Sequence, residues 1–179
     1  RSGRHSLTVD GISRTFHLDL PTQLQGQTAG VVFTFHGIGD SIDNWRRFHQ
    51  GASLDDAELP LIVVTPTDTG LSPMSNPQGL YWDMFMSEPG DDNREGRLVE
   101  SVLACLDQHF ELDPQAVYSM GFSGGAVLSN MLHSRYPNMV GAVAAFSGIW
   151  LNNPHNHDPL GMGGLVPSHW NSLERSEEH

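Results

Sequence analysis

Four short apolar runs constrain the fold of this 179-residue chain more than any other feature. They occupy residues 31–35, 61–65, 116–120 and 140–146. Runs that are apolar for nearly their whole length are typical of strands buried on both faces of a parallel sheet. Segments with helical signals separate them, at residues 42–52, 91–110 and 126–135. This alternation predicts an α/β fold with a mostly parallel sheet and helices on both of its faces.

The N-terminal end of the chain carries a different pattern. Residues 7–9 and 14–20 alternate between apolar and polar side chains. Asp10-Gly11, which lies between them, is a strong signal for a two-residue hairpin turn. We therefore predict an antiparallel hairpin ahead of the parallel strands.

Two local signals bear on the central helix and the strand that follows it. Asp91-Asp92 is expected to open the helix, because acidic residues in a first turn suit the positive end of the helix dipole. Asp113-Pro114 is expected to form a turn immediately before the strand at residues 116–120.

Composition and length limit which binding partners and how many domains the chain can have. The formal charge is −12, from 21 acidic residues against nine arginines and no lysine. Such a chain repels phosphate groups, which argues against nucleic acid and anionic membranes as partners. Its length suits a single domain over residues 1–179, in which residues 149–179 form an irregular tail or a lid-like segment. The one cysteine, Cys105, is expected to be a small core residue on the buried face of its helix.

The stretch Gly121-Phe122-Ser123-Gly124-Gly125 reads G-x-S-x-G and lies between a predicted strand and a predicted helix. A serine on a sharp strand-to-helix turn has its hydroxyl held out of the sheet, open to substrate. Glycines around it allow the backbone a strained turn and close packing. The pattern in this setting predicts that Ser123 is a nucleophile. The alternative is a loop rich in glycine and serine with no chemical role.

Taken together, these motifs resemble the α/β-hydrolase superfamily. Within it, the chain is similar to esterases related to polyhydroxybutyrate depolymerases and to feruloyl and acetylxylan esterases. The resemblance spans about residues 7–148 and rests on the hairpin, the F-H-G turn after the first apolar run, V-Y-S-M-G-F-S-G-G and A-F-S-G. It implies a serine carboxylic-ester hydrolase, in which Ser123 forms an acyl-enzyme that water then hydrolyses.

The same resemblance implies an oxyanion hole, a pair of N–H donors for the charged oxygen of the tetrahedral intermediate. One donor would be the backbone N–H of Gly124. The other would come from the turn after the first apolar run, from Ile38 or Gly37, although this could be an ordinary glycine turn. Asp40 follows in that turn, and we assign it to the loop or to capping the next helix. In this fold the triad acid comes after the nucleophile in the chain.

The acid and the base of a triad are harder to place. The family would supply two more strands after residues 140–146, and no β-rich run of that length follows Gly148. Asp158 and His169 are the candidates we choose for acid and base, from a set that also contains His155, His157 and His179. Three explanations are open: the chain is a fragment that stops before the acid and base, which we favour; a second chain completes the site; or the tail folds back with an atypical histidine.

Several further expectations follow. Tyr81, Trp82 and Trp150 are candidates for substrate contacts, unless the rings at 81 and 82 simply pack over the edge of the core. The His155-Asn156-His157-Asp158 stretch lacks further ligands, so we predict no metal and no cofactor. The substrate is expected to be an ester of a small molecule, polysaccharide or polyester.

The resemblance implies a secreted or periplasmic protein, with a cytoplasmic one as the alternative. Other functions also remain open. The chain could be a catalytically incomplete binding or scaffold module, or a peptidase or thioesterase on the same fold.

Overall fold

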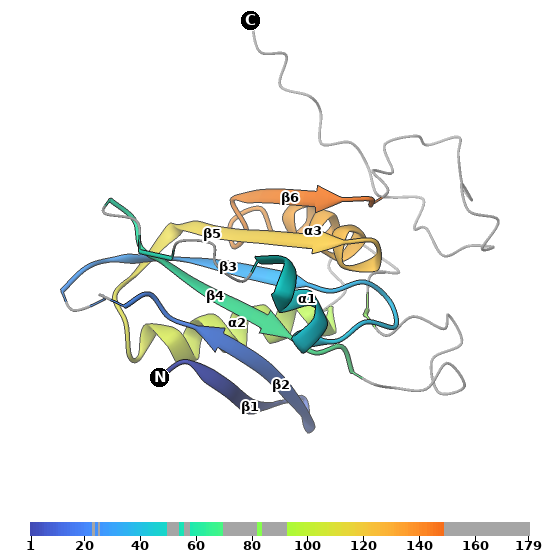
Figure 1. Cartoon of the computed structure of the whole chain (residues 1–179), viewed down its shortest axis with the longest axis horizontal. Helices are drawn as coiled ribbons and strands as arrows, with labels where there is room; N and C mark the ends of the chain where they lie inside the picture. The colour runs from blue at the N-terminus through green and yellow to red at the C-terminus, as the bar shows by residue number, and fades with distance from the viewer. Residues whose placement is uncertain are drawn as a thin grey trace, which may run out of the picture.

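The computed structural model of the chain describes residues 1–22, 24, 26–49, 54–55, 58–69, 82–83 and 93–148. These residues contain one six-stranded sheet in the order β1-β2-β4-β3-β5-β6 (Figure 1). Its strands are β1 (Gly3–Val9), β2 (Ile12–Asp19), β3 (Ala29–Phe35), β4 (Leu61–Pro66), β5 (Leu112–Phe122) and β6 (Ala142–Phe146).

Strand directions confirm the predicted fold class. Strand β3 pairs in parallel with β4 on one side and with β5 on the other, and β5 pairs in parallel with β6. Strand β2 is antiparallel to both of its neighbours, β1 and β4, so among the described strands it alone runs in the opposite direction. The sheet is therefore mixed but mostly parallel, and its N-terminal antiparallel hairpin is present.

The hairpin turn follows from its two central residues. Asp10 has a φ of 51° and Gly11 a φ of 75°, so both lie in the left-handed region. Val9 pairs directly with Ile12 across this two-residue turn. Aspartate and glycine tolerate left-handed backbone better than most residues, and such turns match the twist of the flanking strands. The Asp10-Gly11 prediction is confirmed.

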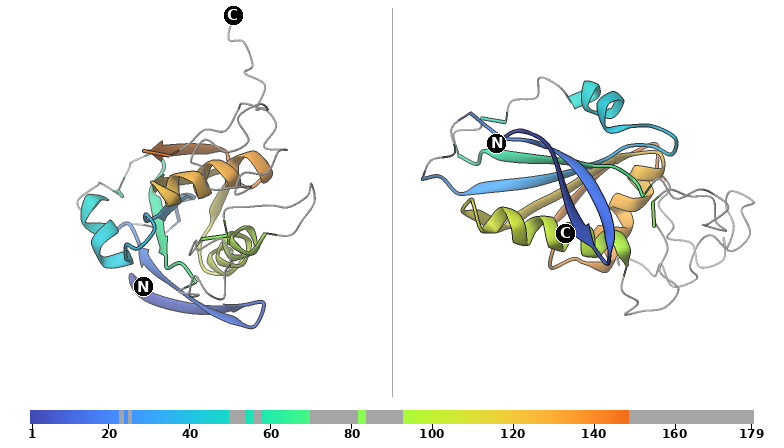
Figure 2. Two further views of the ribbon diagram at one scale, coloured as in Figure 1. Left: turned by 90° about the vertical axis from the view of Figure 1, so that its right-hand side faces the viewer. Right: turned by 90° about the horizontal axis from the view of Figure 1, so that it is seen from below.

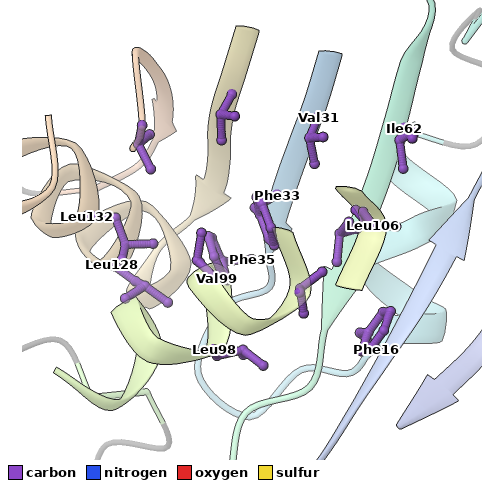
Figure 3. Close-up of a cluster of buried hydrophobic side chains, with 14 of the residues drawn as sticks. Phe16, Val31, Phe33, Phe35, Ile62, Leu98, Val99, Leu106, Leu128 and Leu132 are labelled. Atoms are coloured by element: carbon purple, nitrogen blue, oxygen red, sulfur yellow. The ribbon is translucent and has the colours of Figure 1, made fainter. Parts of the chain in front are cut away.

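Helices cover both faces of the sheet, as predicted. Helix α1 (Ile42–His49) lies on one face, and α2 (Arg94–Asp107) and α3 (Gly124–Arg135) lie on the other (Figure 2). The main core forms between the sheet and the latter pair (Figure 3). Its fully buried members include Val31, Phe33, Phe35, Ile62, Leu98, Val99, Leu128 and Leu132.

Helix α2 begins later than the sequence suggested. Asn93 is its N-cap, and its side-chain oxygen accepts hydrogen bonds from the backbone N–H groups of Glu95 and Gly96, at 2.9 and 3.1 Å. Asparagine is among the best N-caps because it satisfies donors that the first helical turn leaves free. The helix therefore starts at Arg94, and Asp91-Asp92 precede the described segment.

Cys105 is exposed, which contradicts its predicted place in the core. Successive helical residues are turned by about 100° around the axis. The buried stripe of α2 passes through Val102 and Leu106, and Cys105 is one step away from Leu106 on the solvent side. The helical spacing was correct, but the stripe is narrower than the sequence suggested.

Two predictions about strands also need correction. Residues 140–146 do contain a strand, β6, but four of its five residues are exposed, because it is the outermost described strand on that side of the sheet. Asp113-Pro114 lies inside β5 and not in a separate turn. Its local turn chemistry is nevertheless present, since the Asp113 carboxylate accepts a hydrogen bond from the Gln115 N–H at 2.9 Å and the pairing with β3 shifts register there.

Candidate active site

Ser123 stands where β5 ends and α3 begins. Its φ of 52° and ψ of −117° lie in a region that non-glycine residues seldom adopt, at a cost of about 1–3 kcal/mol. Neighbouring backbone groups hold it there. Its N–H donates to the Phe146 carbonyl at 2.9 Å, and its carbonyl accepts from the N–H groups of Ala126 and Val127 at 3.0 and 3.1 Å. The strain is thus maintained by the end of β6 and the first turn of α3.

Two glycines make this turn possible. A Cβ on Gly121 would overlap the carbonyl oxygen of Gly125, and a Cβ on Gly125 would overlap the carbonyl oxygen of Phe35. The latter Cβ would also come within 2.7 Å of the His36 carbonyl oxygen. The turn is therefore pressed against the C-terminal end of β3 and the segment that follows it. This is the physical reason for glycine at both positions of the motif.

The side chain of Ser123 is available for reaction. The residue is half-buried, and its hydroxyl makes no capping hydrogen bond to α3. Among the described residues, no polar group is hydrogen-bonded to that hydroxyl. A strained serine with an unoccupied hydroxyl at the start of a helix is the arrangement expected of a nucleophile.

The turn after β3 lies against Ser123, as the sequence predicted. A Cβ on Gly37 would sit 3.5 Å from the Cβ of Ser123. A Cβ on Gly124 would sit 2.6 Å from Cγ1 of Ile38 and 3.6 Å from its backbone nitrogen. In the described part of the chain, the N–H groups of Gly124 and Ile38 donate to no acceptor. The structure therefore brings together four predicted residues: Ser123, Gly124, Gly37 and Ile38.

His36 fixes the orientation of the next peptide. Its ring is buried, and Nδ1 lies 2.8 Å from the carbonyl oxygen of Gly37. Since a carbonyl oxygen can only accept, Nδ1 carries the proton. The same oxygen accepts from the Asp40 N–H at 3.1 Å. In a planar trans peptide, C=O and N–H point in opposite directions, so holding the Gly37 carbonyl also fixes the direction of the Ile38 N–H.

Asp40 braces this loop, in agreement with its assignment from the sequence. Its carboxylate accepts from the Ser41 N–H at 2.7 Å and from the side-chain amide of Asn44 at 2.8 Å. The N-cap hydrogen bond of α1 comes from the next residue, because the Ser41 hydroxyl accepts from the Asn44 N–H at 3.3 Å. These contacts tie the loop after Gly37 to the start of the helix.

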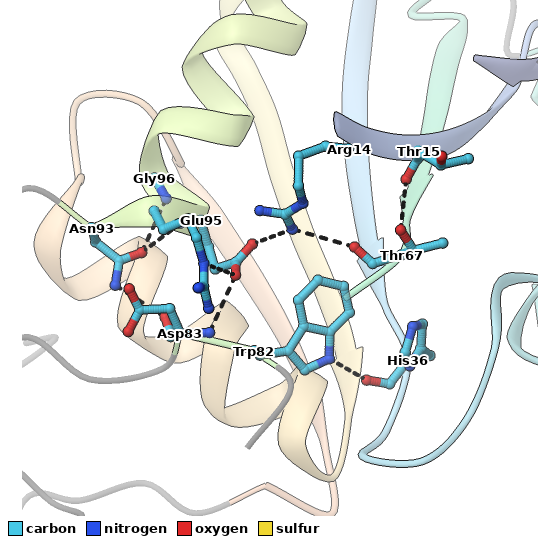
Figure 4. Close-up of polar contacts among 10 residues, drawn as sticks. Arg14, Thr15, His36, Thr67, Trp82, Asp83, Asn93, Glu95 and Gly96 are labelled. Atoms are coloured by element: carbon cyan, nitrogen blue, oxygen red, sulfur yellow. Dashed lines mark hydrogen bonds and ion pairs between the residues drawn. The ribbon is translucent and has the colours of Figure 1, made fainter. Parts of the chain in front are cut away.

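Trp82 lies behind the turn after β3, where it is completely buried. Its indole N–H donates to the His36 carbonyl oxygen at 3.0 Å (Figure 4). Its ring meets the Phe35 ring edge-on, with centroids 5.4 Å apart, and the His36 ring at 4.9 Å. This burial favours the alternative interpretation of Trp82, packing at the edge of the core, over a substrate contact.

The remaining predicted residues cannot be placed. Tyr81, Trp150, Asp158 and His169 all lie outside the described residues, and so does the whole of 149–179. The acid and base therefore stay predictions. Within the described ranges, no group of His, Cys, Asp and Glu side chains is arranged to hold a metal ion.

Sequence reasoning missed a buried ion pair close to the site. Nη2 of Arg14 in β2 lies 2.6 Å from Oε2 of Glu95 in α2, and both side chains are almost fully buried. The other carboxylate oxygen of Glu95 accepts from the Asp83 N–H at 3.2 Å (Figure 4). A signal for it exists in the sequence: Arg14 falls on the apolar face of its strand, and Glu95 falls in the apolar stripe of its helix. Opposite charges at two such positions indicate a buried pair.

Three exposed apolar side chains belong to the segments that meet at Ser123. Phe122, which precedes Ser123, is 43% exposed, and Phe146, its register partner on β6, is 52% exposed. Ile38 is also exposed, on the turn after β3. The Phe122 ring stacks on the Trp45 ring of α1, with centroids 6.2 Å apart. A separate cavity of about 820 Å³ lies at the other end of β5, lined by Leu112 among others, and does not include Ser123.

Comparisons with known proteins agree with this geometry. The chain is 29% identical to feruloyl esterase B of Thermothelomyces thermophilus over 74% of this chain and 43% of the relative. It is 29% identical to feruloyl esterase D of Neurospora crassa over 89% of this chain and 54% of the relative. The chain thus spans about half the length of the curated relatives it matches.

A solved structure shares the fold. An S-formylglutathione hydrolase from Agrobacterium tumefaciens superposes with a TM-score of 0.64 at 20% identity, over 87% of this chain and 60% of that one. None of the helices in the described ranges is long and apolar enough to cross a membrane. The model of the family "Putative esterase" matches residues 10–175, which is almost the whole chain. The chain therefore has an α/β-hydrolase-type fold and belongs to this esterase family.

Proposed function

We propose that the protein is a serine carboxylic-ester hydrolase that acts through an acyl-enzyme on Ser123. One observation carries this proposal: a strained serine with an unoccupied hydroxyl lies beside two unengaged N–H donors, on Gly124 and Ile38. Membership of the esterase family and the names of the relatives support the same reaction.

The reaction has two steps, acylation of Ser123 and hydrolysis of the acyl-enzyme. The Ser123 oxygen attacks the ester carbonyl and gives its proton to a general base, while the carbonyl oxygen becomes negative. The N–H groups of Gly124 and Ile38 stabilise that oxygen, each by about 3 kcal/mol. Collapse of the intermediate breaks the bond to the alcohol, which takes the proton. Water then attacks the acyl-enzyme carbonyl in the same way, and the carboxylic acid leaves as Ser123 regains its proton.

In the part of the chain that the structure describes, no histidine is hydrogen-bonded to the Ser123 hydroxyl, so we assign the general base to residues outside that part or to a second chain. His169, oriented by Asp158, is the pair that the sequence offers. A secreted or periplasmic location stays a prediction.

The surroundings of Ser123 support an ester with an apolar acyl or alcohol part. Phe122 and Ile38 are exposed apolar residues on the two turns that meet at Ser123, and an apolar group that covers them would be removed from water. Feruloyl esterases among the relatives make an aromatic acid ester the first substrate to test, free or attached to a polysaccharide.

A labelling experiment on the natural full-length protein tests the proposal. A fluorophosphonate probe should modify Ser123, identified by mass spectrometry, and p-nitrophenyl acetate should be hydrolysed with an initial burst. Ser123→Ala should abolish both, while Ser6→Ala, an exposed serine on β1, should leave both unchanged. A folded protein with neither labelling nor turnover would instead be a binding module on a hydrolase fold.

A further inference from the structure

The side chain of Trp82 packs against the turn after β3 and donates a hydrogen bond to it. The indole N–H is its only polar group, and it is aimed at the carbonyl oxygen of His36, 3.0 Å away (Figure 4). The indole is fully buried, so water cannot substitute for this bond. A buried carbonyl that loses its donor costs about 1–3 kcal/mol, so the turn would rearrange to recover a partner.

Two successive carbonyls of the turn are fixed in this way. Trp82 holds the carbonyl of His36, and the His36 ring with the Asp40 N–H holds the carbonyl of Gly37. The two peptide planes that lead to the Ile38 N–H therefore have little freedom to rotate. The His36 ring, which packs on the indole at 4.9 Å, depends on Trp82 for its own position as well.

Trp82 is anchored in turn by its neighbour Asp83. The Asp83 N–H donates to the Glu95 carboxylate at 3.2 Å, and its carbonyl accepts from the side-chain amide of Asn93 at 3.0 Å. Glu95 is ion-paired with Arg14, whose side chain also donates to the Thr67 carbonyl at 3.3 Å. Thr67, directly after β4, and Asp83, within the long segment that follows it, are therefore both tied to one buried ion pair.

We propose that Trp82 is a positioning residue for the oxyanion hole, holding the Ile38 N–H in place through the His36 carbonyl. The inference rests on the proposed function. It assigns to Trp82 a part in the reaction without contact with substrate. Because a developing oxyanion is sensitive to the position of its donors, loss of the indole N–H should lower kcat by about 10- to 100-fold and change KM little.

The experiment compares two buried tryptophans in the natural full-length protein. Trp82→Phe keeps an aromatic ring but removes the donor to His36. Trp45→Phe is the matched control, because Trp45 is also buried and its indole nitrogen has no partner among the described residues. The readouts are kcat and KM for p-nitrophenyl esters, and the affinity for a trifluoromethyl ketone, whose adduct with Ser123 places an oxyanion in the hole.

The expected result is a loss in kcat and in inhibitor affinity for Trp82→Phe alone, with KM unchanged. If the parent enzyme is active and both variants match it in kcat, the positioning role is refuted while the esterase proposal stands. If the parent enzyme neither turns over esters nor reacts with a fluorophosphonate, both proposals fail.

A second substitution distinguishes the loss of the hydrogen bond from a loss of folding. Replacing Trp82 with benzothienylalanine exchanges only the N–H for sulfur and keeps the bicyclic shape. The same loss in kcat is expected with a nearly unchanged melting temperature. Full activity in this variant would overturn the inference.

Discussion

The backbone nitrogen of Ile38 lies 3.6 Å from where a Cβ on Gly124 would be, although the two residues belong to different turns of the chain. One turn follows β3 and the other follows β5, and these strands are parallel neighbours in the sheet. Neighbouring parallel strands end at the same edge, so the backbones of Gly124 and Ile38 come close together beside Ser123. A crevice at the carboxyl ends of parallel strands is where ligands bind in open α/β sheets.

Gly124→Ala tests this proximity directly. The new Cβ would come within 2.6 Å of Cγ1 of Ile38, which must move and carry its backbone N–H with it. We expect kcat for an aryl ester to fall by about 10- to 100-fold, as for other disturbances of oxyanion donors. The double variant Gly124→Ala/Ile38→Ala, which removes the obstructing side chain, should recover most of the loss. No recovery would mean that the Gly124 change acts in some other way.

Gly125→Ala should damage the fold more than the chemistry. Its Cβ would overlap the Phe35 carbonyl oxygen, and backbone atoms on a central strand cannot yield as a flexible side chain can. We expect a loss of about 3 kcal/mol in the free energy of unfolding, at the upper end of the usual range for overpacking. Urea unfolding followed by tryptophan fluorescence measures it. A stability equal to that of the parent protein would contradict the packing described for the turn.

The ion pair of Arg14 and Glu95 should respond differently to single and double changes. Removing one partner leaves a buried charge unpaired, so Arg14→Met and Glu95→Leu should each cost about 3–5 kcal/mol in the free energy of unfolding. The double variant Arg14→Met/Glu95→Leu should cost much less than the two single changes added together.

The control for that cycle is the exposed pair of Arg4 and Asp43 on the surface. Its side chains are about half to two-thirds exposed, at 52% and 64%, and Asp43→Asn should change stability by less than about 1 kcal/mol. Strictly additive costs at Arg14 and Glu95 would show that the buried pair is not coupled.

Stability should fall as the pH drops below about 6.5, the usual pKa of histidine. Burial lowers the pKa of His17 and of His49 in the folded protein, and the partly opposing attraction of Asp19 does not reverse either shift. The unfolded chain therefore binds more protons between the lowered pKa values and 6.5, and this favours unfolding there. Both contributions are fully present above 6.5 and are lost as the pH falls through that window.

Melting temperatures measured from about pH 8 down to about pH 5 provide the test, because histidine titrates in this range. His49→Gln should flatten the decline, because it removes one of the two groups. An equally steep decline in that variant would assign the pH dependence to other residues.

The sequence alone determined the local structure around Ser123. The Asp10-Gly11 turn, the order of strands and helices and the G-x-S-x-G turn all depend on residues close together in the chain, and local sterics decide them. The family resemblance indicated Gly37 and Ile38 as neighbours of Ser123, and in the structure their proximity results from the pairing of β3 with β5.

Only the tertiary structure decided which residues support that site. The Trp82 indole meets the His36 carbonyl, and the charge of Glu95 in α2 is balanced by Arg14 in β2. Which residues of α2 are buried, and that Cys105 is not among them, also depends on how the helix packs. These features result from contacts between segments far apart in the chain. Periodicity can show that a side chain faces inward, but only the packed fold shows which partner it meets there.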